Sequence, residues 1–181
     1  RSLIGDIPGG PPNADLLALD AIVKVAENNV AGALTQSEAA VVADRHSAAA
    51  WLALSYARQA ARNPVGALEA ADAACLAAPD DALAWARRAE MALSLSMIEA
   101  GRRHAEQALS LDPGVPRGSA LLGFAELLAG NSAGASTLFE NALRVDANEP
   151  LAHLGAGLGL IRSGRLADGR RELETAVILD P

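Results

Sequence analysis

The residues best suited to catalysis or metal binding are few in this chain and lie far apart in its sequence. It has three histidines and one cysteine, at His46, Cys75, His104 and His153. None belongs to an HExxH motif or to a Cys–His pair, the spacings that bring ligands, or a nucleophile and its base, to one place. We therefore expect no catalytic, cofactor-binding or metal-binding residues and predict that the chain is not an enzyme.

Each of these side chains has a structural interpretation instead. Cys75 lies among alanines and leucines with no histidine or cationic cluster to activate it, which favours a small buried apolar residue. A glycine-rich run from Gly155 to Gly159 lacks the GxGxxG spacing of a dinucleotide loop and lies inside a predicted helix. Close helix packing is the simpler explanation of that run, and local softness of the helix is the alternative.

Charged residues exclude two classes of partner. The formal net charge is −7, and Lys24 is the only lysine. Nucleic acids and anionic membranes require a positive footprint, so we expect neither as a partner. The arginine pairs at 87–88, 102–103 and 170–171 have acidic residues nearby and are predicted to lie on a solvated face, with Glu99–Arg103 and Arg170–Glu174 as i,i+4 partners. No stretch approaches the roughly 20 apolar residues needed to insert into a membrane.

A 34-residue period organises the chain from Ala14 onward. The predicted units are 14–47, 48–81, 82–115, 116–149 and 150–181. Trp51 and Trp85 share position 4 of their units, while Pro79, Pro113 and Pro181 share position 32. Positions 8, 20 and 27 hold only Gly, Ala or Ser, as expected where helices cross closely.

Each unit is predicted to form a helix, a short turn and a second helix. Gly130 and Gly164 suit left-handed caps after the first helix. Before the units, residues 1–13 are rich in proline and glycine, which favours a linker. The alternative is that Leu3, Ile4 and Ile7 cover the first helix pair.

These units resemble the tetratricopeptide-repeat family, whose 34-residue motif has small residues at these positions. The resemblance implies an all-α fold, a right-handed superhelical α-solenoid in which first helices line a concave groove and second helices form the back. It further implies a protein or peptide ligand in that groove. By the family's geometry, the groove residues are Leu52, Tyr56, Gln59, Leu83, Glu90, Leu93, Arg117, Phe124, Leu127, Leu128, Leu154, Leu158, Ile161 and Arg162.

We therefore predict a protein–protein interaction scaffold that binds an apolar or amphipathic peptide or helix. The alternative is a structural module that self-associates through uncapped ends or packs within a larger, envelope-associated protein. Some phrases, among them the stretch from Gly157 to Pro181, resemble repeat arrays of bacterial envelope proteins with an upstream FecR-like domain. That resemblance slightly favours the bacterial periplasm or cell envelope over the cytoplasm.

Overall fold

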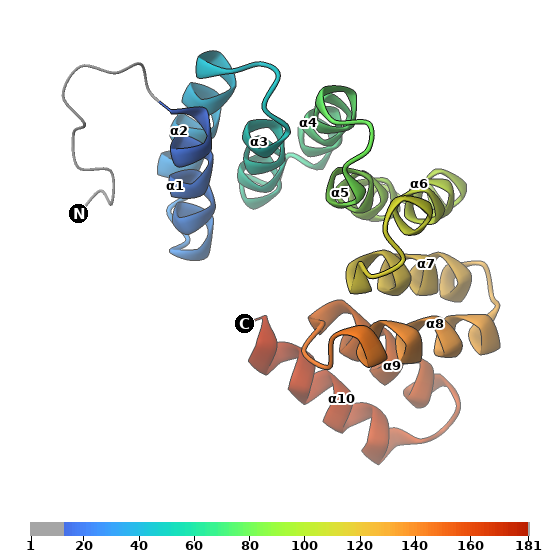
Figure 1. Ribbon diagram of the computed structural model, residues 1–181. Helices are drawn as coiled ribbons and strands as arrows, with labels where there is room; N and C mark the ends of the chain where they lie inside the picture. Colours follow the sequence, from blue (N-terminus) through green and yellow to red (C-terminus); the bar gives the residue numbers. More distant parts are fainter. Residues whose placement is uncertain (1–12, 181) are drawn as a thin grey trace. The chain divides into compact units, whose positions relative to one another are not determined.

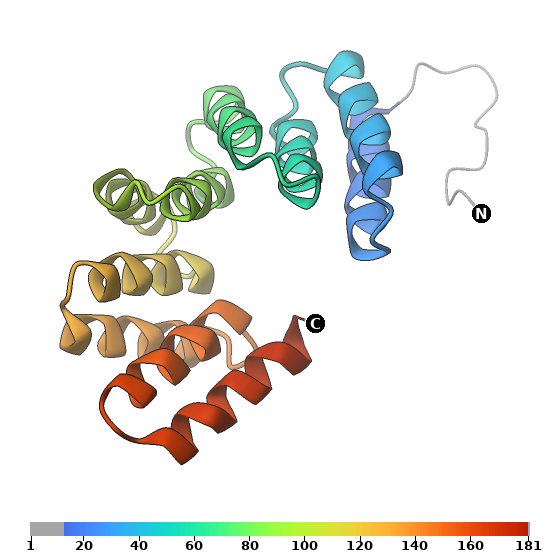
Figure 2. The same cartoon turned by 180° about the vertical axis from the view of Figure 1, so that it is seen from behind.

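Ten α-helices follow one another in pairs in the computed structural model, which describes residues 13–180 (Figure 1; Figure 2 from behind). The first helices are α1 (Ala14–Ala26), α3 (Ala48–Ala60), α5 (Ala82–Ser94), α7 (Pro116–Leu128) and α9 (Pro150–Arg162). The second helices are α2 (Val30–Ala43), α4 (Pro64–Ala77), α6 (Ile98–Leu111), α8 (Ser132–Val145) and α10 (Leu166–Leu179). Each helix begins 34 residues after its counterpart, as predicted. The predicted linker lies outside the described residues, apart from Asn13.

The helices belong to two compact units, 1–95 and 96–181, which divide between α5 and α6 inside the third predicted repeat. In the first unit, α1 packs on α2 and α3, α3 packs on α4 and α5, α2 contacts α3, and α4 contacts α5. In the second unit, α7 packs on α6, α8 and α9, while α9 also contacts α8 and α10. Each first helix is therefore packed against second helices, and this arrangement orients its outer face.

Every first helix is followed, two residues after its end, by a residue in the left-handed backbone region. The positive φ values are 57° at Asn28, 58° at Arg62, 60° at Ser96, 89° at Gly130 and 84° at Gly164. All five residues occupy position 15 of their repeats. The caps predicted at Gly130 and Gly164 are confirmed, and three side-chain-bearing residues adopt the same conformation at a steric cost that glycine avoids.

Asparagine is the N-cap residue of three of the second helices. The side chains of Asn29, Asn63 and Asn131 each accept a hydrogen bond from the backbone N–H of a glycine three residues later. A Cβ on Gly134 would lie 2.4 Å from the Asn131 side chain, so the cap requires glycine there. This Asn-x-x-Gly pattern satisfies an N–H group that the helix itself leaves unpaired.

Small residues form the core, as the periodic positions predicted. The residues at positions 8, 20 and 27 are buried in all five repeats. In the last pair, an added Cβ on Gly157 would lie 2.9 Å from the carbonyl oxygen of Gly169. The backbones of α9 and α10 therefore approach each other more closely than any larger residue would allow.

Candidate interaction surfaces

A buried arginine joins three of the predicted groove residues in the first unit. Arg87 is 1% exposed, and its guanidinium carbon lies 3.8 Å from the centre of the Tyr56 ring. Its Nη2 donates to Gln59 Oε1 at 2.8 Å, and its Nη1 lies 3.1 Å from Glu90 Oε2. The same side chain donates from Nε to Ser55 Oγ at 2.8 Å. Tyr56, Gln59 and Glu90 thus surround one fixed positive charge.

The prediction of solvated arginine pairs was wrong at the first pair. Arg87 is buried as described, and Arg88 is half-buried, with its Nε 2.6 Å from Asp72 Oδ1. The prediction is correct for Arg170, which pairs with Glu174 at 2.7 Å on an exposed surface.

Another predicted ion pair has a different partner. Arg102, instead of Arg103, contacts Glu99, at 2.8 Å. The two side chains of an i,i+3 pair face each other on a helix as well as those of an i,i+4 pair do.

The other predicted residues of the first unit differ in exposure. Leu83 is exposed, whereas Leu52 and Leu93 are half-buried. Leu52 packs against a core cluster that contains Ala74, Cys75 and Ala84. Leu83 is therefore the most accessible apolar side chain among the predicted groove residues of this unit.

An apolar stripe runs along α9 in the second unit. Leu154, Leu158 and Ile161 are 39%, 38% and 36% exposed, and their spacing of four and three residues places them on one face of the helix. Arg162 follows on the exposed end of the same helix. On α7, Leu128 is exposed, and the Arg117 guanidinium lies 4.0 Å from the Glu149 carboxylate.

Two predicted groove residues of α7 take part in the core. Leu127 is 7% exposed and packs with Ala135 and Phe139. Leu127 thus lies against α8. Phe124 is half-buried and meets Phe139 edge to face, with ring centres 5.2 Å apart.

Two glycines of neighbouring first helices enclose the ring of Phe139. A Cβ on Gly123 of α7 would lie 2.7 Å from this ring, and a Cβ on Gly155 of α9 would lie 2.2 Å from it. Ordinary carbon–carbon contacts are about 3.5–4.0 Å, so neither position accepts a side chain without displacing the ring. Close packing thus explains Gly155, as predicted for the glycine run.

Position 4 makes a recurring contact that no motif predicted. Trp51 Nε1 donates to the carbonyl oxygen of Arg45 at 2.9 Å, and Trp85 Nε1 donates to that of Pro79 at 2.8 Å. His153 Nε2 lies 2.9 Å from the corresponding carbonyl oxygen of Ala147. His153 therefore replaces tryptophan in its packing role.

His153 also contacts an acidic side chain. Its Nδ1 lies 2.7 Å from Glu172 Oε2 on α10. Burial lowers the pKa of His153, but hydrogen bonds to the Glu172 carboxylate and the Ala147 carbonyl outweigh it, and the net pKa is raised. Both partners accept hydrogen bonds, so they favour the doubly protonated ring.

Cys75 fits a structural role. It is buried, and burial raises the pKa of its thiol to about 11. Across residues 13–180, the structure brings together no group of three or more His, Cys, Asp or Glu side chains that could hold a metal ion. In the same part of the chain, no helix is both long and apolar enough to cross a membrane.

No protein-family model and no curated protein matches this chain. Solved structures do match it. PilF of Pseudomonas aeruginosa is 20% identical with a TM-score of 0.74, covering 93% of this chain and 77% of PilF. TTC0263, a thermophilic tetratricopeptide-repeat protein of Thermus thermophilus, is 16% identical with a TM-score of 0.80, covering 93% of this chain and 92% of TTC0263.

A third match is YrrB, described as a tetratricopeptide-repeat protein with an unusual peptide-binding site. It is 15% identical with a TM-score of 0.60, covering 93% of this chain and 87% of YrrB. At such identities the similarity concerns the fold. Together with ten helices in tandem pairs, it establishes an all-α tetratricopeptide-repeat fold.

Proposed function

We propose that this tetratricopeptide-repeat chain is a protein-interaction scaffold that binds an apolar or amphipathic peptide or helix along the first helices of its repeats. The observation that carries the proposal is the stripe of Leu154, Leu158 and Ile161. At 3.6 residues per turn these side chains fall within an arc of about 60° on α9. Amphipathic helices offer a matching row of anchors at i, i+3, i+4 and i+7.

The Arg87 network supports the same proposal in the first unit. Tyr56 is held over the guanidinium, and Gln59 and Glu90 contact the same group. Side chains that are already ordered lose less conformational entropy when a ligand binds. Tyr56 is thus a pre-oriented aromatic contact for a peptide, with Leu83 exposed on the next first helix.

The test begins with peptides selected from a random phage-displayed library against the whole chain. Their dissociation constants are measured by calorimetry for the unmodified chain, for Leu158→Glu and for Val145→Glu. Val145 is an exposed apolar residue on α8, outside the predicted groove, and serves as the matched control. Phe124→Glu is unsuitable because Phe124 packs on Phe139.

We expect Leu158→Glu to weaken binding at least tenfold, because a charge would be buried against an apolar ligand, while Val145→Glu leaves it unchanged. Equal affinities for all three chains, each with unaltered helicity, would reject the stripe as the binding surface.

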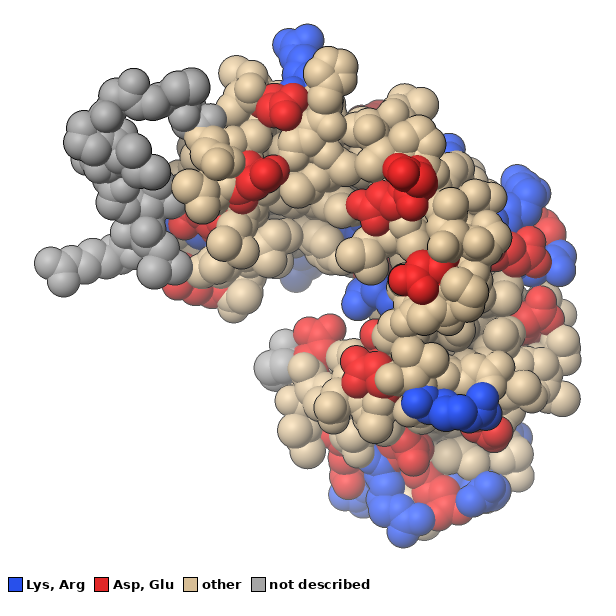
Figure 3. All heavy atoms as spheres, in the orientation of Figure 1, with Lys and Arg blue, Asp and Glu red and all other residues tan. Residues whose placement is uncertain are grey.

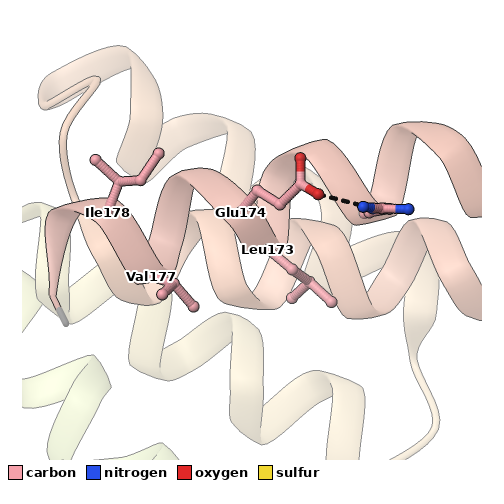
Figure 4. A pocket seen from close by; sticks show the side chains of 5 residues that line it. Leu173, Glu174, Val177 and Ile178 are labelled. Carbon is pink, nitrogen blue, oxygen red and sulfur yellow. Dashed lines mark hydrogen bonds and ion pairs between the residues drawn. The ribbon is translucent and has the colours of Figure 1, made fainter.

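A second candidate is self-association through α10, and a specific observation favours it. Val177 and Ile178 are 66% and 79% exposed, and with Leu173 they line an open depression of about 580 Å3 (Figure 4). At Val177's position in earlier repeats, Val41, Cys75 and Leu143 pack beside buried alanines of the next first helix.

The outer face of α10 thus has the composition of a helix-packing surface, and a helix of another copy, or of the same protein, would cover it. Light scattering at several concentrations tests this alternative. A concentration-dependent mass that Val177→Glu abolishes supports self-association through this face, and a constant monomeric mass excludes it. An envelope location remains a prediction.

A further inference from the structure

A second hollow of the second unit opens beside α9, on the face of this helix that points away from the apolar stripe. It has a volume of about 520 Å3 and is lined by residues of α8, α9 and α10, together with Leu127 of α7. Such a volume falls within the range of pockets that hold ligands, about 300–1,000 Å3. Its apolar wall includes Phe139, Leu143 and Leu160, and exposed serines and charged residues stand at its edge.

The hollow is separate from the stripe proposed above. Its α9 lining consists of Ala156, Gly159 and Leu160, and Ser163 caps the end of this helix. At 100° per residue these positions centre about 180° from the stripe around Leu158. A ligand in the hollow would therefore contact the opposite face of α9, and the two sites can be tested independently.

Small residues on α9 create the hollow. Ala156 occupies the position that holds Leu54, Arg88 and Leu122 in the preceding three repeats, and Gly159 aligns with Met91 of the third. A Cβ on Gly159 would meet nothing within 4 Å.

Gly159 thus differs from Gly155 and Gly157, which close packing requires. A glycine inside a helix costs about 1 kcal/mol relative to alanine, and no neighbouring group demands it at this position. The absence of a side chain at Gly159 keeps the space beside it open.

The charges around the hollow favour a cationic ligand. Glu140 accepts a hydrogen bond from Ser136 Oγ, and among the described residues no cation pairs with it. Glu172 contacts His153. Arg165 lies 2.7 Å from the Asp168 carboxylate, which Arg171 also contacts, so Glu140 is the lining carboxylate without a cationic partner in the described part of the chain. In Figure 3, red and blue atoms are mixed over the surface of α10 in this unit.

The polar groups of the hollow are the serines and charged side chains at its edge, whereas its wall is apolar. Among its described lining residues, no side-chain polar atom is buried without a hydrogen-bond partner. Its apolar wall and acidic edge instead complement one large apolar side chain flanked by positive charge.

We propose that this hollow binds a large apolar side chain, aromatic or aliphatic, presented by a basic segment of a partner protein. The side chain packs against Phe139, Leu143 and Leu160 above Gly159. The flanking cations face Glu140 and Glu172. This proposal does not depend on the stripe of Leu154, Leu158 and Ile161.

The test uses the peptide acetyl-RSFSR-amide and two relatives, in which the Phe is replaced by Ala or both Arg by Glu. Each is titrated into the isotope-labelled whole chain, and amide chemical shifts are followed by NMR. We expect saturable shifts at Ser136, Gly159 and Ser163 with a dissociation constant of about 1 mM, which corresponds to a weak contact. Both replacements should weaken binding at least fivefold.

Three variants distinguish binding in the hollow from binding on the stripe. Gly159→Leu fills the space from inside and improves helix propensity, so it should abolish binding without loss of helicity. Gly159→Ala adds one methyl group and should change binding less than threefold. Leu158→Glu alters the opposite face of α9 and should leave this binding unchanged.

The proposal is overturned if the basic Phe peptide produces no saturable shifts at these three residues up to several times 1 mM. It is equally overturned if Gly159→Leu binds as the unmodified chain does, or if the acidic peptide binds as tightly as the basic one. Loss of binding in Leu158→Glu would assign the peptide to the stripe and would also reject the hollow as its site.

Discussion

One methyl group should have opposite effects at two positions of α9, Gly155 and Gly159. The substitution is glycine to alanine in both cases, in the same helix and four residues apart. A Cβ at position 155 would lie 2.2 Å from two ring carbons of Phe139, whereas a Cβ at 159 meets nothing within 4 Å. Differences in stability between the two variants therefore report on packing and cancel the effect of helix propensity.

The magnitudes follow from these distances. Alanine in place of a helical glycine stabilises by about 1 kcal/mol, and this is the whole effect expected at 159. At 155 the Phe139 ring would have to retreat by more than about 1 Å to reach an ordinary contact distance. The ring cannot retreat toward α7, because Gly123 lies close on that side. A Cβ built on Gly123 would lie only 2.7 Å from the ring.

Overpacking of this kind costs about 1–3 kcal/mol. After the gain in helix propensity, we expect Gly155→Ala to destabilise by about 1 kcal/mol and Gly159→Ala to stabilise by about as much. The difference of about 2 kcal/mol corresponds to several degrees in melting temperature.

Urea titration followed by far-UV circular dichroism measures both variants. Trp51 and Trp85 belong to the first unit, so their fluorescence shows separately whether that unit is affected. Phe139→Leu combined with Gly155→Ala completes a double-mutant cycle, and the smaller side chain should recover part of the loss. If both alanine variants were equally stabilising, the tight enclosure of Phe139 would be refuted.

Three further outcomes concern polar and titratable groups. Arg87→Ala should lower stability by roughly 3 kcal/mol or more in urea titration, because it removes the buried donor to Ser55 and the cation beside Glu90; a loss below about 1 kcal/mol would contradict this. The raised pKa of His153 means that its stabilising contact is complete below the unfolded pKa of 6.5 and is lost as pH rises through the folded pKa. His153→Trp should remove that pH dependence from the urea midpoint, and a persistent dependence would assign it to another group. Cys75, with a pKa of about 11, should react with a thiol reagent at about pH 8 far more slowly in the native chain than in urea, and equal rates would disprove its burial.

The fold was predictable because its constraints recur every 34 residues. Positions 8, 20 and 27 accept only small side chains, and that restriction is visible as a pattern. A further recurring signal was missed: Asn29, Asn63 and Asn131 each precede a glycine by three residues and cap the second helix. The third and fifth repeats have Met97 and Arg165 at this position, without a side-chain cap.

The candidate surfaces were less predictable because exposure depends on what each neighbour leaves open. Leu127 and Ile161 occupy the same position of their repeats, yet Leu127 is buried against Phe139 and Ile161 is exposed. The position of a residue in its repeat therefore identifies the face of the helix on which it lies. The size of the side chains on the adjacent second helix decides whether that residue remains accessible.

A large side chain at one position of a repeat is matched by a small one at a facing position of the next repeat, and this exchange of volume also explains the buried arginine. Position 24 of one repeat and position 6 of the next hold Ala71 with Arg87 in one pair and Phe139 with Gly155 in another. For the second pair the contact is direct, since the Phe139 ring fills the space above Gly155. In the first pair a small residue stands at position 24, and the long side chain at position 6 reaches Ser55 and the predicted groove residues.

The same exchange accounts for both of the binding features proposed for α9. Gly155 admits the ring of Phe139, whose edge becomes part of the wall of the hollow. Gly159, without such a neighbour, leaves its space empty, and Leu154, Leu158 and Ile161 form an exposed stripe on the opposite face. A helix that carried leucine at 159 would lose the hollow and keep the stripe, so the two binding activities should be separable by a single substitution that does not weaken the fold.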